Sequence, residues 1–354
     1  MSNFVAINAK IDAMYSKLLS PEDFEPLIST NSFKDTVEFL KSKELFKDLN
    51  FGMNTNEAES ALDMFLYEQL KRLISYLSGP YRDFLNEYIR VKEYNDLKKA
   101  LRFLVRDRNK ETYEFSLNGK TFDIADMDLK TFVEKCKNSI YYRTLRTYID
   151  EPSDQILFYM EMNLDKLYYT RIIECVKSFS KENKEEFTEI FGRKIDIANI
   201  IWIYRGSVNY KLLDEELINF IIFGGKYLNF QTLRELSHLD NIKGFKSILS
   251  KTPYDFLFNE NGETIANVSV SANRLCYDFA CKEFRKTHSN FGHLLSFIVV
   301  FEAQLRDIKI FMEAQRLDIG KGKVSDYLVN VRKWNYGSWK NENDECHGTF
   351  RWYG

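Results

Sequence analysis

One helical pattern occurs three times in this chain, at intervals of about 100 residues. The copies read EYNDLKKALRF, DIANIIWIYRG and QLRDIKIFMEA. Each places an Asp or Asn inside an apolar stripe, at Asp96, Asn199 and Asp307, which we call the anchor positions. Asx side chains compete with helical hydrogen bonding, so they are uncommon on a buried helix face. Their recurrence at one place in the pattern indicates three copies of one structural unit.

Apolar residues flank each anchor at steps of three and four, which predicts a helix with one buried face. We expect these three anchor helices to superpose by rotation about one axis, with the anchors in equivalent surroundings. The aligned apolar sets are Phe84, Phe187 and Leu295; Tyr94, Ile197 and Leu305; Leu97, Ile200 and Ile308; and Ala100, Ile203 and Phe311.

A second helix is predicted before each anchor helix, and it carries two acids at a fixed spacing in the first two copies. These positions hold Glu59 and Asp63, then Glu161 and Asp165, then Ala272 and Cys276. A third element opens each unit, with helix starts predicted at Ser20, Asp128 and Asn229. Such side chains cap the unpaired amides of a first helical turn.

The chain is therefore predicted to be mainly all-α, with three similar helical domains in a pseudo-three-fold arrangement around an opening. The expected boundaries are 1–118, 119–212 and 213–330, followed by an irregular tail at 331–354. Only 5 Pro and 15 Gly occur in 354 residues, which favours long helices over many short strands. One β-hairpin is predicted within 111–124, because Asn118-Gly119 is a strong two-residue turn.

Arg102 and Arg205 each stand six residues after an anchor. A residue six positions later lies about 240° around the axis of a helix with 3.6 residues per turn, so neither Arg faces its own anchor or can pair with it. A buried Arg needs an acid from another helix, although all of these groups could instead be solvated. The candidate acids lie in the same unit: Glu59 or Asp63 for Arg102, and Glu161 or Asp165 for Arg205. In the third unit Glu313 replaces the Arg and both acids are absent, which suggests a scaffold rather than an active site.

No catalytic, cofactor-binding or metal-binding set can be assembled from the sequence. His288 and His293 are five residues apart, so they do not share a helix face. The stretch 223–226, FGGK, lacks the spacing of a phosphate loop and has no Ser or Thr after the Lys. The 50 basic and 52 acidic residues argue against a nucleic-acid partner.

The sequence also predicts a soluble chain. The longest apolar runs, LLSFIVVF and INFIIFGG, are far shorter than the roughly 20 residues of a membrane-spanning helix. The N-terminal segment has charges within its apolar pattern, unlike a signal peptide. Five cysteines without a CxxC pair are typical of free thiols in a reducing cytoplasm.

Three stretches of the chain resemble the C subunit of prokaryotic V/A-type ATPases, whose eukaryotic counterpart is the d subunit. These are the opening AINAKIDAMYSKLLSPEDFEPLI, the anchor stretches NDLKKALR and IANIIWIYR, and the late FEAQLRDIKIFMEAQRLDIGKGKVSDYLV. The resemblance extends from Phe4 to Val329, and the order of the three units is its most specific part.

The resemblance implies a funnel of three helical domains without catalytic activity or cofactors. Its wide face would take the central-stalk rotor subunits of a soluble ATPase head, and its other face the membrane rotor ring of ion-carrying subunits. The chain would then transmit torque for proton or sodium transport, as a cytoplasmic protein peripheral to the membrane. Polar side chains from all three units would line the mouth. The alternatives are a free-standing helical scaffold or adaptor, and a helical enzyme with a cofactor pocket between lobes.

Overall fold

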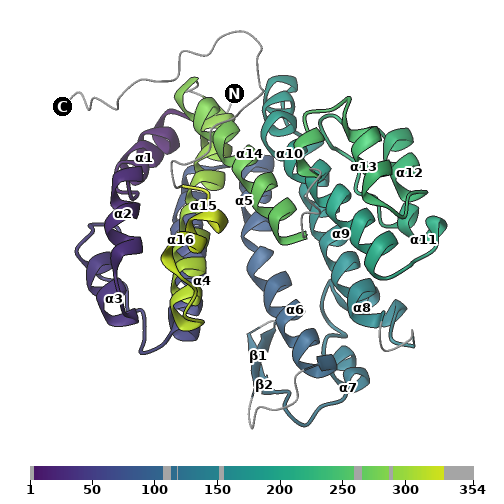
Figure 1. Ribbon diagram of the computed structural model, residues 1–354, viewed down its shortest axis with the longest axis horizontal. Helices are drawn as coiled ribbons and strands as arrows, with labels where there is room; N and C mark the ends of the chain where they lie inside the picture. The colour runs from purple at the N-terminus through teal and green to yellow at the C-terminus, as the bar shows by residue number, and fades with distance from the viewer. Residues whose placement is uncertain are drawn as a thin grey trace.

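The computed structural model describes residues 4–106, 113–117, 119–150, 155–258, 265–286 and 290–330. This part of the chain is mainly helical and contains one small sheet, which confirms the predicted fold class (Figure 1). The expected tail at 331–354 lies outside the described residues, and so does His288.

The three units are those that the sequence predicts, and the first of these runs from the N-terminal helices to the first anchor helix. Its start at Ser20 is confirmed as a helix cap, because the Ser20 amide donates to the Asp23 carboxylate at 2.8 Å and Pro21 opens the helix. The elements are α1 (Val5–Tyr15), α2 (Pro21–Ser29), α3 (Phe33–Lys41), α4 (Thr55–Leu73), a 3₁₀ turn (Ile74–Tyr76), α5 (Gly79–Ile89) and α6 (Val91–Arg106).

The second unit begins with the predicted hairpin, which is confirmed. Its strands pair antiparallel with Leu117 opposite Lys120, and Gly119 has the φ of +73° that such a turn requires. The hairpin therefore spans the boundary expected between 118 and 119. Asp128 caps its helix, as predicted, by accepting from the Thr131 amide at 2.7 Å. The elements are β1 (Glu114–Leu117), β2 (Lys120–Asp123), α7 (Leu129–Lys135), α8 (Tyr142–Thr147), α9 (Ile156–Val176), α10 (Lys181–Tyr204) and a π-helical turn (Arg205–Asn209).

The third unit contains the longest helix of the described chain. Asn229 is the predicted cap and accepts from the Thr232 amide at 2.9 Å. The elements are α11 (Asp214–Asn219), α12 (Phe230–Ser237), α13 (Ile242–Leu249), a 3₁₀ turn (Asp255–Leu257), α14 (Ile265–Lys286), α15 (Phe291–Arg316), α16 (Lys321–Val324) and a 3₁₀ turn (Ser325–Tyr327).

The apolar stripes predicted around the anchors are buried in all three units, in α6, α10 and α15. Leu97, Ile200 and Ile308 have no exposed surface. The first unit differs in one respect, because its anchor helix is divided at Arg90 into α5 and α6, whereas α10 and α15 are continuous. The period of three and four residues therefore identified the core face, but not this break.

Long helices connect the units in a cycle, from the first to the second, the second to the third and the third to the first. Each anchor helix packs against the second helix of another unit: α6 against α9, α10 against α14, and α15 against α4. No unit therefore buries its anchor helix alone. This arrangement decides which side chains meet across the unit boundaries.

Aromatic rings fill the region where α5, α10 and α15 meet. Phe84 of α5 lies 6.1 Å from Phe191 of α10 and 5.4 Å from Phe291 of α15, measured between ring centroids. Burying each of these rings contributes about 1.5–3 kcal/mol. From this region the helices spread toward the bottom of Figure 1, with α4, α15 and α16 on one side and α6 on the other.

Candidate functional site

Two of the three anchors are buried and hold a later segment of the chain. Asn199 makes two bonds to the backbone of Ile222: its amide donates to the carbonyl at 2.8 Å, and its oxygen accepts from the amide at 2.9 Å. Asp307 accepts from the Val329 and Asn330 amides, both at 2.7 Å. These bonds explain why an Asx residue interrupts an apolar stripe, since it satisfies backbone groups that the core would otherwise leave unpaired.

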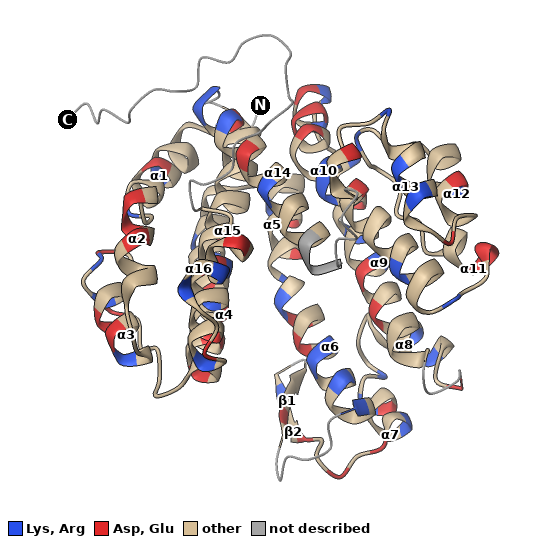
Figure 2. Cartoon of the chain, in the orientation of Figure 1, with Lys and Arg blue, Asp and Glu red and all other residues tan. Residues whose placement is uncertain are grey.

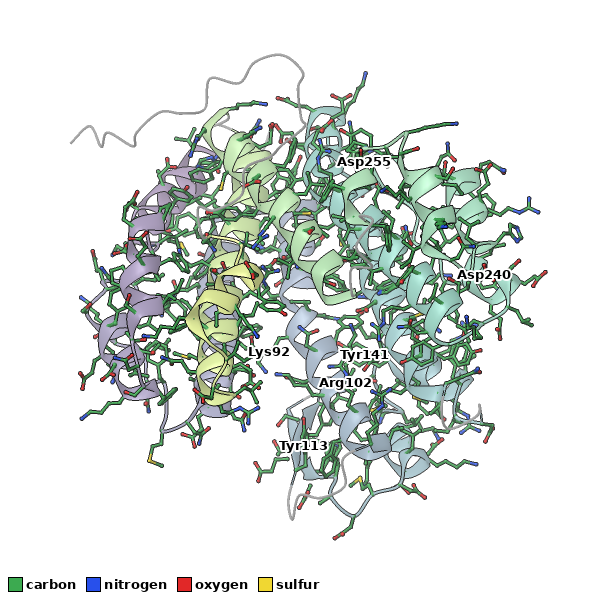
Figure 3. All side chains as sticks on the ribbon, in the orientation of Figure 1. Lys92, Arg102, Tyr113, Tyr141, Asp240 and Asp255 are labelled. Carbon is green, nitrogen blue, oxygen red and sulfur yellow. The ribbon has the colours of Figure 1, made fainter. Side chains whose placement is uncertain are left out.

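Asp96 does not share these surroundings, so the expectation of three equivalent anchors is wrong for the first unit. Its side chain is 36% exposed and pairs at 2.7 Å with Lys92, one turn earlier on α6. In Figure 3 Lys92 and Arg102 lie along α6 in the central part of the view. Asp96 therefore contributes to a helix surface instead of fixing a loop.

A second polar position, not predicted above, recurs one helical turn before each anchor. Asp196 is buried and accepts from the Tyr227 amide and the Tyr254 hydroxyl, both at 2.8 Å. Gln304, also buried, makes two bonds to the backbone of Leu19. Glu93 accepts from the Tyr141 hydroxyl at 2.5 Å. The recurrence of a polar residue three positions before each anchor was the available signal.

Asp196 also explains one glycine. A side chain at Gly225 would place its Cβ 1.9 Å from the Asp196 carboxylate. Burial raises the pKa of Asp196 against the opposing effect of its hydrogen bonds. The segment 223–226, already excluded as a phosphate loop, therefore lies at a buried carboxylate that accepts bonds from the backbone at 226–228. We call such a buried Asx side chain with its backbone donors or acceptors a polar lock.

Arg102 makes an ion pair, but with a different unit from the one expected. It donates to Glu161 of α9 at 2.5 Å, not to Glu59 or Asp63 of its own unit. Lys98, one turn earlier on α6, pairs with Asp165. The correction follows from the packing of α6 on α9, which brings the acids of the second unit to the bases of the first.

Arg205 makes no ion pair with an acid in the described residues, so its expected pairing with Glu161 or Asp165 is wrong. Those acids are already taken by α6. The Arg205 guanidinium lies 5.7 Å from the ring centroid of Phe158, where the ring face attracts a cation. The half-buried guanidinium therefore contacts an aromatic ring and not a carboxylate.

The acids of α4 face a different helix again. Asp63 accepts from Lys309 of α15 at 2.6 Å and from Lys99 of α6 at 3.4 Å, so it links the first unit to the third. Glu59 lies one turn away and is half-buried. Burial raises the pKa of Glu59, with a further contribution from the charge of Glu313 and opposing contributions from Lys309 and Lys99.

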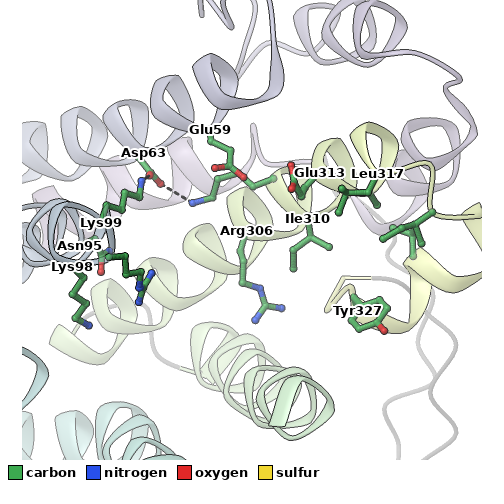
Figure 4. A pocket seen from close by; sticks show the side chains of 15 residues that line it. Glu59, Asp63, Asn95, Lys98, Lys99, Arg306, Ile310, Glu313, Leu317 and Tyr327 are labelled. Atoms are coloured by element: carbon green, nitrogen blue, oxygen red, sulfur yellow. Dashed lines mark hydrogen bonds and ion pairs between the residues drawn. The ribbon is translucent and has the colours of Figure 1, made fainter. Parts of the chain in front are cut away.

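These residues line a cleft of about 510 Å³ between α6 and α15, with Glu59 and Asp63 of α4 along its upper edge in Figure 4. Figure 2 shows basic positions along the lower half of α6. The lining residues come from the first and third units: Glu59, Asp63, Asn95, Lys98, Lys99, Arg102, Arg306, Lys309, Ile310, Glu313, Ala314, Leu317, Ile319, Val324 and Tyr327. The contribution from all three units that was expected at the mouth of a central opening stays a prediction, since this cleft is lined by two units.

The second unit differs because its anchor helix is apolar at the corresponding face. Ile201 and Trp202 stand where α6 has Lys98 and Lys99, and both are half-buried. Trp202 packs against Tyr169 with ring centroids 6.3 Å apart. The charged cleft is thus a property of two units only.

The described residues hold no group of three or more His, Cys, Asp and Glu side chains that could bind a metal ion. None of the helices in this part of the chain is long and apolar enough to cross a lipid bilayer. The cysteines at 136, 175, 276 and 281 are unbridged. The cleft combines charged side chains with exposed apolar ones, a combination that is common where one protein recognises another.

Residues 7–327 match the model of the ATP synthase (C/AC39) subunit family. The chain belongs to this family. It is similar to the C subunit of the A-type ATP synthase of Methanosarcina mazei, with 23% identity over 93% of this chain and 94% of the relative. The corresponding protein of Methanosphaera stadtmanae is 21% identical over 91% and 86%, and that of Thermococcus kodakarensis is 23% identical over 74% and 72%.

The C/AC39 match covers all three units and every residue that lines the cleft. It confirms the resemblance to the C subunit of V/A-type ATPases. The match ends just before Val329 and Asn330, the segment that Asp307 holds.

Proposed function

We propose that this chain is a non-catalytic central-stalk component of a V/A-type ATPase, which links the rotor shaft of the soluble head to the membrane ring of ion-carrying subunits. Membership of the C/AC39 family carries this proposal. The three units would surround an axis, with the cleft at the wide end taking the shaft and the aromatic end facing the ring. In this position the chain transmits torque for ATP-coupled proton or sodium transport.

The packing supports a torque-bearing role. Each anchor helix is buried against another unit, and ion pairs join α6 to α9 and α15 to α4. A load applied to one unit is therefore passed to its neighbours through buried contacts. Such closely packed interfaces deform little, which a coupling part requires.

The test is the removal of the chain from the complex. Membranes that lack it should lose ATP-driven ion transport, while the detached head still hydrolyses ATP. Adding back the purified chain should restore transport. If membranes without the chain pump ions at the normal rate per ATP, the coupling role is wrong and the scaffold or adaptor interpretation replaces it.

A further inference from the structure

The α6–α9 and α15–α4 interfaces are alike two residues after the anchor, where each has a Lys–Asp pair. They differ six residues after it, where the first has an ion pair and the second has two acids. Two residues after the anchor, Lys98 pairs with Asp165 at the α6–α9 interface, and Lys309 pairs with Asp63 at the α15–α4 interface. Six residues after the anchor, Arg102 pairs with Glu161. The corresponding residues between α15 and α4 are both acids, Glu313 and Glu59.

This second position therefore holds two carboxylates where the related interface holds an acid and a base. Glu59 has no cation within ion-pair distance among the described residues, although it is half-buried. Glu313 is engaged on its outer side by Arg316, at 2.5 and 2.8 Å. The charges of Lys309 and Lys99 act on Glu59 against that of Glu313, but both lysines bond to Asp63 and not to Glu59. A cation placed beside Glu59 and Glu313 would give Glu59 the direct partner that Glu161 has in Arg102.

The same end of the cleft exposes large apolar side chains. Leu317 is 53% exposed, Ile319 38% and Tyr327 40%, and all three line the cleft. Figure 4 shows Glu59, Glu313 and Leu317 along one edge of it. Apolar side chains exposed in a concave, charge-bearing surface are typical of a site that another protein covers.

We propose that a Lys or Arg side chain of the rotor shaft enters this end of the cleft and pairs with Glu59 and Glu313. Apolar side chains of the same shaft helix then pack on Leu317, Ile319 and Tyr327. This inference rests on the proposed function, and it adds the chemistry of the partner surface: a basic residue with apolar neighbours. The carboxylate pair gives the contact its register, since a shaft turned to present an acid would be repelled.

Glu313→Arg tests the proposal directly, because it recreates within the chain the arrangement of Arg102 and Glu161. The new Arg should pair with Glu59. The same Arg occupies the place of the shaft cation, so affinity for the detached ATPase head with its shaft should fall by at least about tenfold, or 1.4 kcal/mol. Affinity is measured by surface plasmon resonance at low and at physiological salt.

Glu25→Arg is the matched control, because it makes the same change on the exposed outer face of α2. It should leave the affinity for the head unchanged. Glu59→Gln is the second variant, and it also serves if Glu313→Arg fails to fold. It removes one carboxylate of the pair without adding a cation, so it should weaken binding and flatten the salt dependence.

The outcomes separate the two proposals. If the wild-type chain does not bind the head, the proposed function fails. If the wild type binds and both cleft variants bind equally well, the basic-partner inference is overturned while the proposed function stands.

Discussion

Asp307 and Asp96 occupy the same place in the repeat but have different roles. Asp307 has no exposed surface and accepts from four N–H groups: two of the backbone, one of the Asn330 side chain and one of the Arg306 guanidinium. Asp96 is partly exposed and pairs with Lys92 on its own helix. The difference lies in the segment that returns to the anchor. In the second and third units a buried segment 22 or 23 residues later meets it, whereas the β1–β2 hairpin, with which the second unit begins, lies at that distance from Asp96.

The repeat therefore preserves the core face more strictly than the polar contacts made from it. A buried stripe is constrained at every turn by packing, so its period survives in all three copies. A polar lock needs a particular partner, and it is lost when the following segment changes. Substitutions at the three anchors should therefore lower the free energy of unfolding by different amounts, most at Asp307 and least at Asp96.

Asp307→Ala should give the largest effect in that series. It leaves four donors without this acceptor, three of them in the buried Val329 and Asn330, and we expect a loss of about 3 kcal/mol in the free energy of unfolding. Urea denaturation followed by circular dichroism measures it. Asp307→Asn is the control, since it keeps the shape and one acceptor oxygen. A loss below about 1 kcal/mol for the Ala variant would mean that the lock contributes little.

Asn199→Asp should be the next largest effect, at about 2 kcal/mol. The Asn199 amide donates to the Ile222 carbonyl, and a carboxylate in its place would face that carbonyl with no proton to share. The two anchors are thus not interchangeable: Asn is tolerated at 307, and Asp is not tolerated at 199. Equal tolerance of both exchanges in the same unfolding assay would show that the locks are not specific.

The sequence predicted the buried faces of the helices well, but it did not predict which polar side chains and backbone groups pair with one another. Leu97, Ile200 and Ile308 follow from periodicity alone, because any helix with that stripe must bury it. The pairing of Arg102 with Glu161 depends on which units pack together, and no local pattern contains that information. The lock at Asp196 was recognisable as a recurring polar position, but its partners in 226–228 were not.

The pH dependence of stability should distinguish the anchors further. Burial raises the pKa of Asp307, with Arg306 and the bonds from Asn330 and Val329 acting in the opposite direction. A carboxyl whose folded pKa is raised stabilises the fold below its unfolded pKa of about 4, and that contribution is lost as the pH rises through the folded pKa. Asp307→Asn should therefore gain stability relative to the wild type as the pH is raised from 4 upward. An unchanged difference between the two melting curves across that range would contradict this.

Asp96→Ala should have the smallest effect of the series. Its bond to Lys92 is a half-exposed pair within one helix, with the base placed before the acid, which is the weaker orientation. Such a pair contributes under about 0.5 kcal/mol. Ala is also the better helix former, by up to about 0.7 kcal/mol, so the two changes should nearly cancel. The same urea titration applies, with Lys92→Ala as the partner control. A loss above about 1 kcal/mol would show that Asp96 holds a distant segment as Asn199 and Asp307 do, and the distinction between the first unit and the other two would fail.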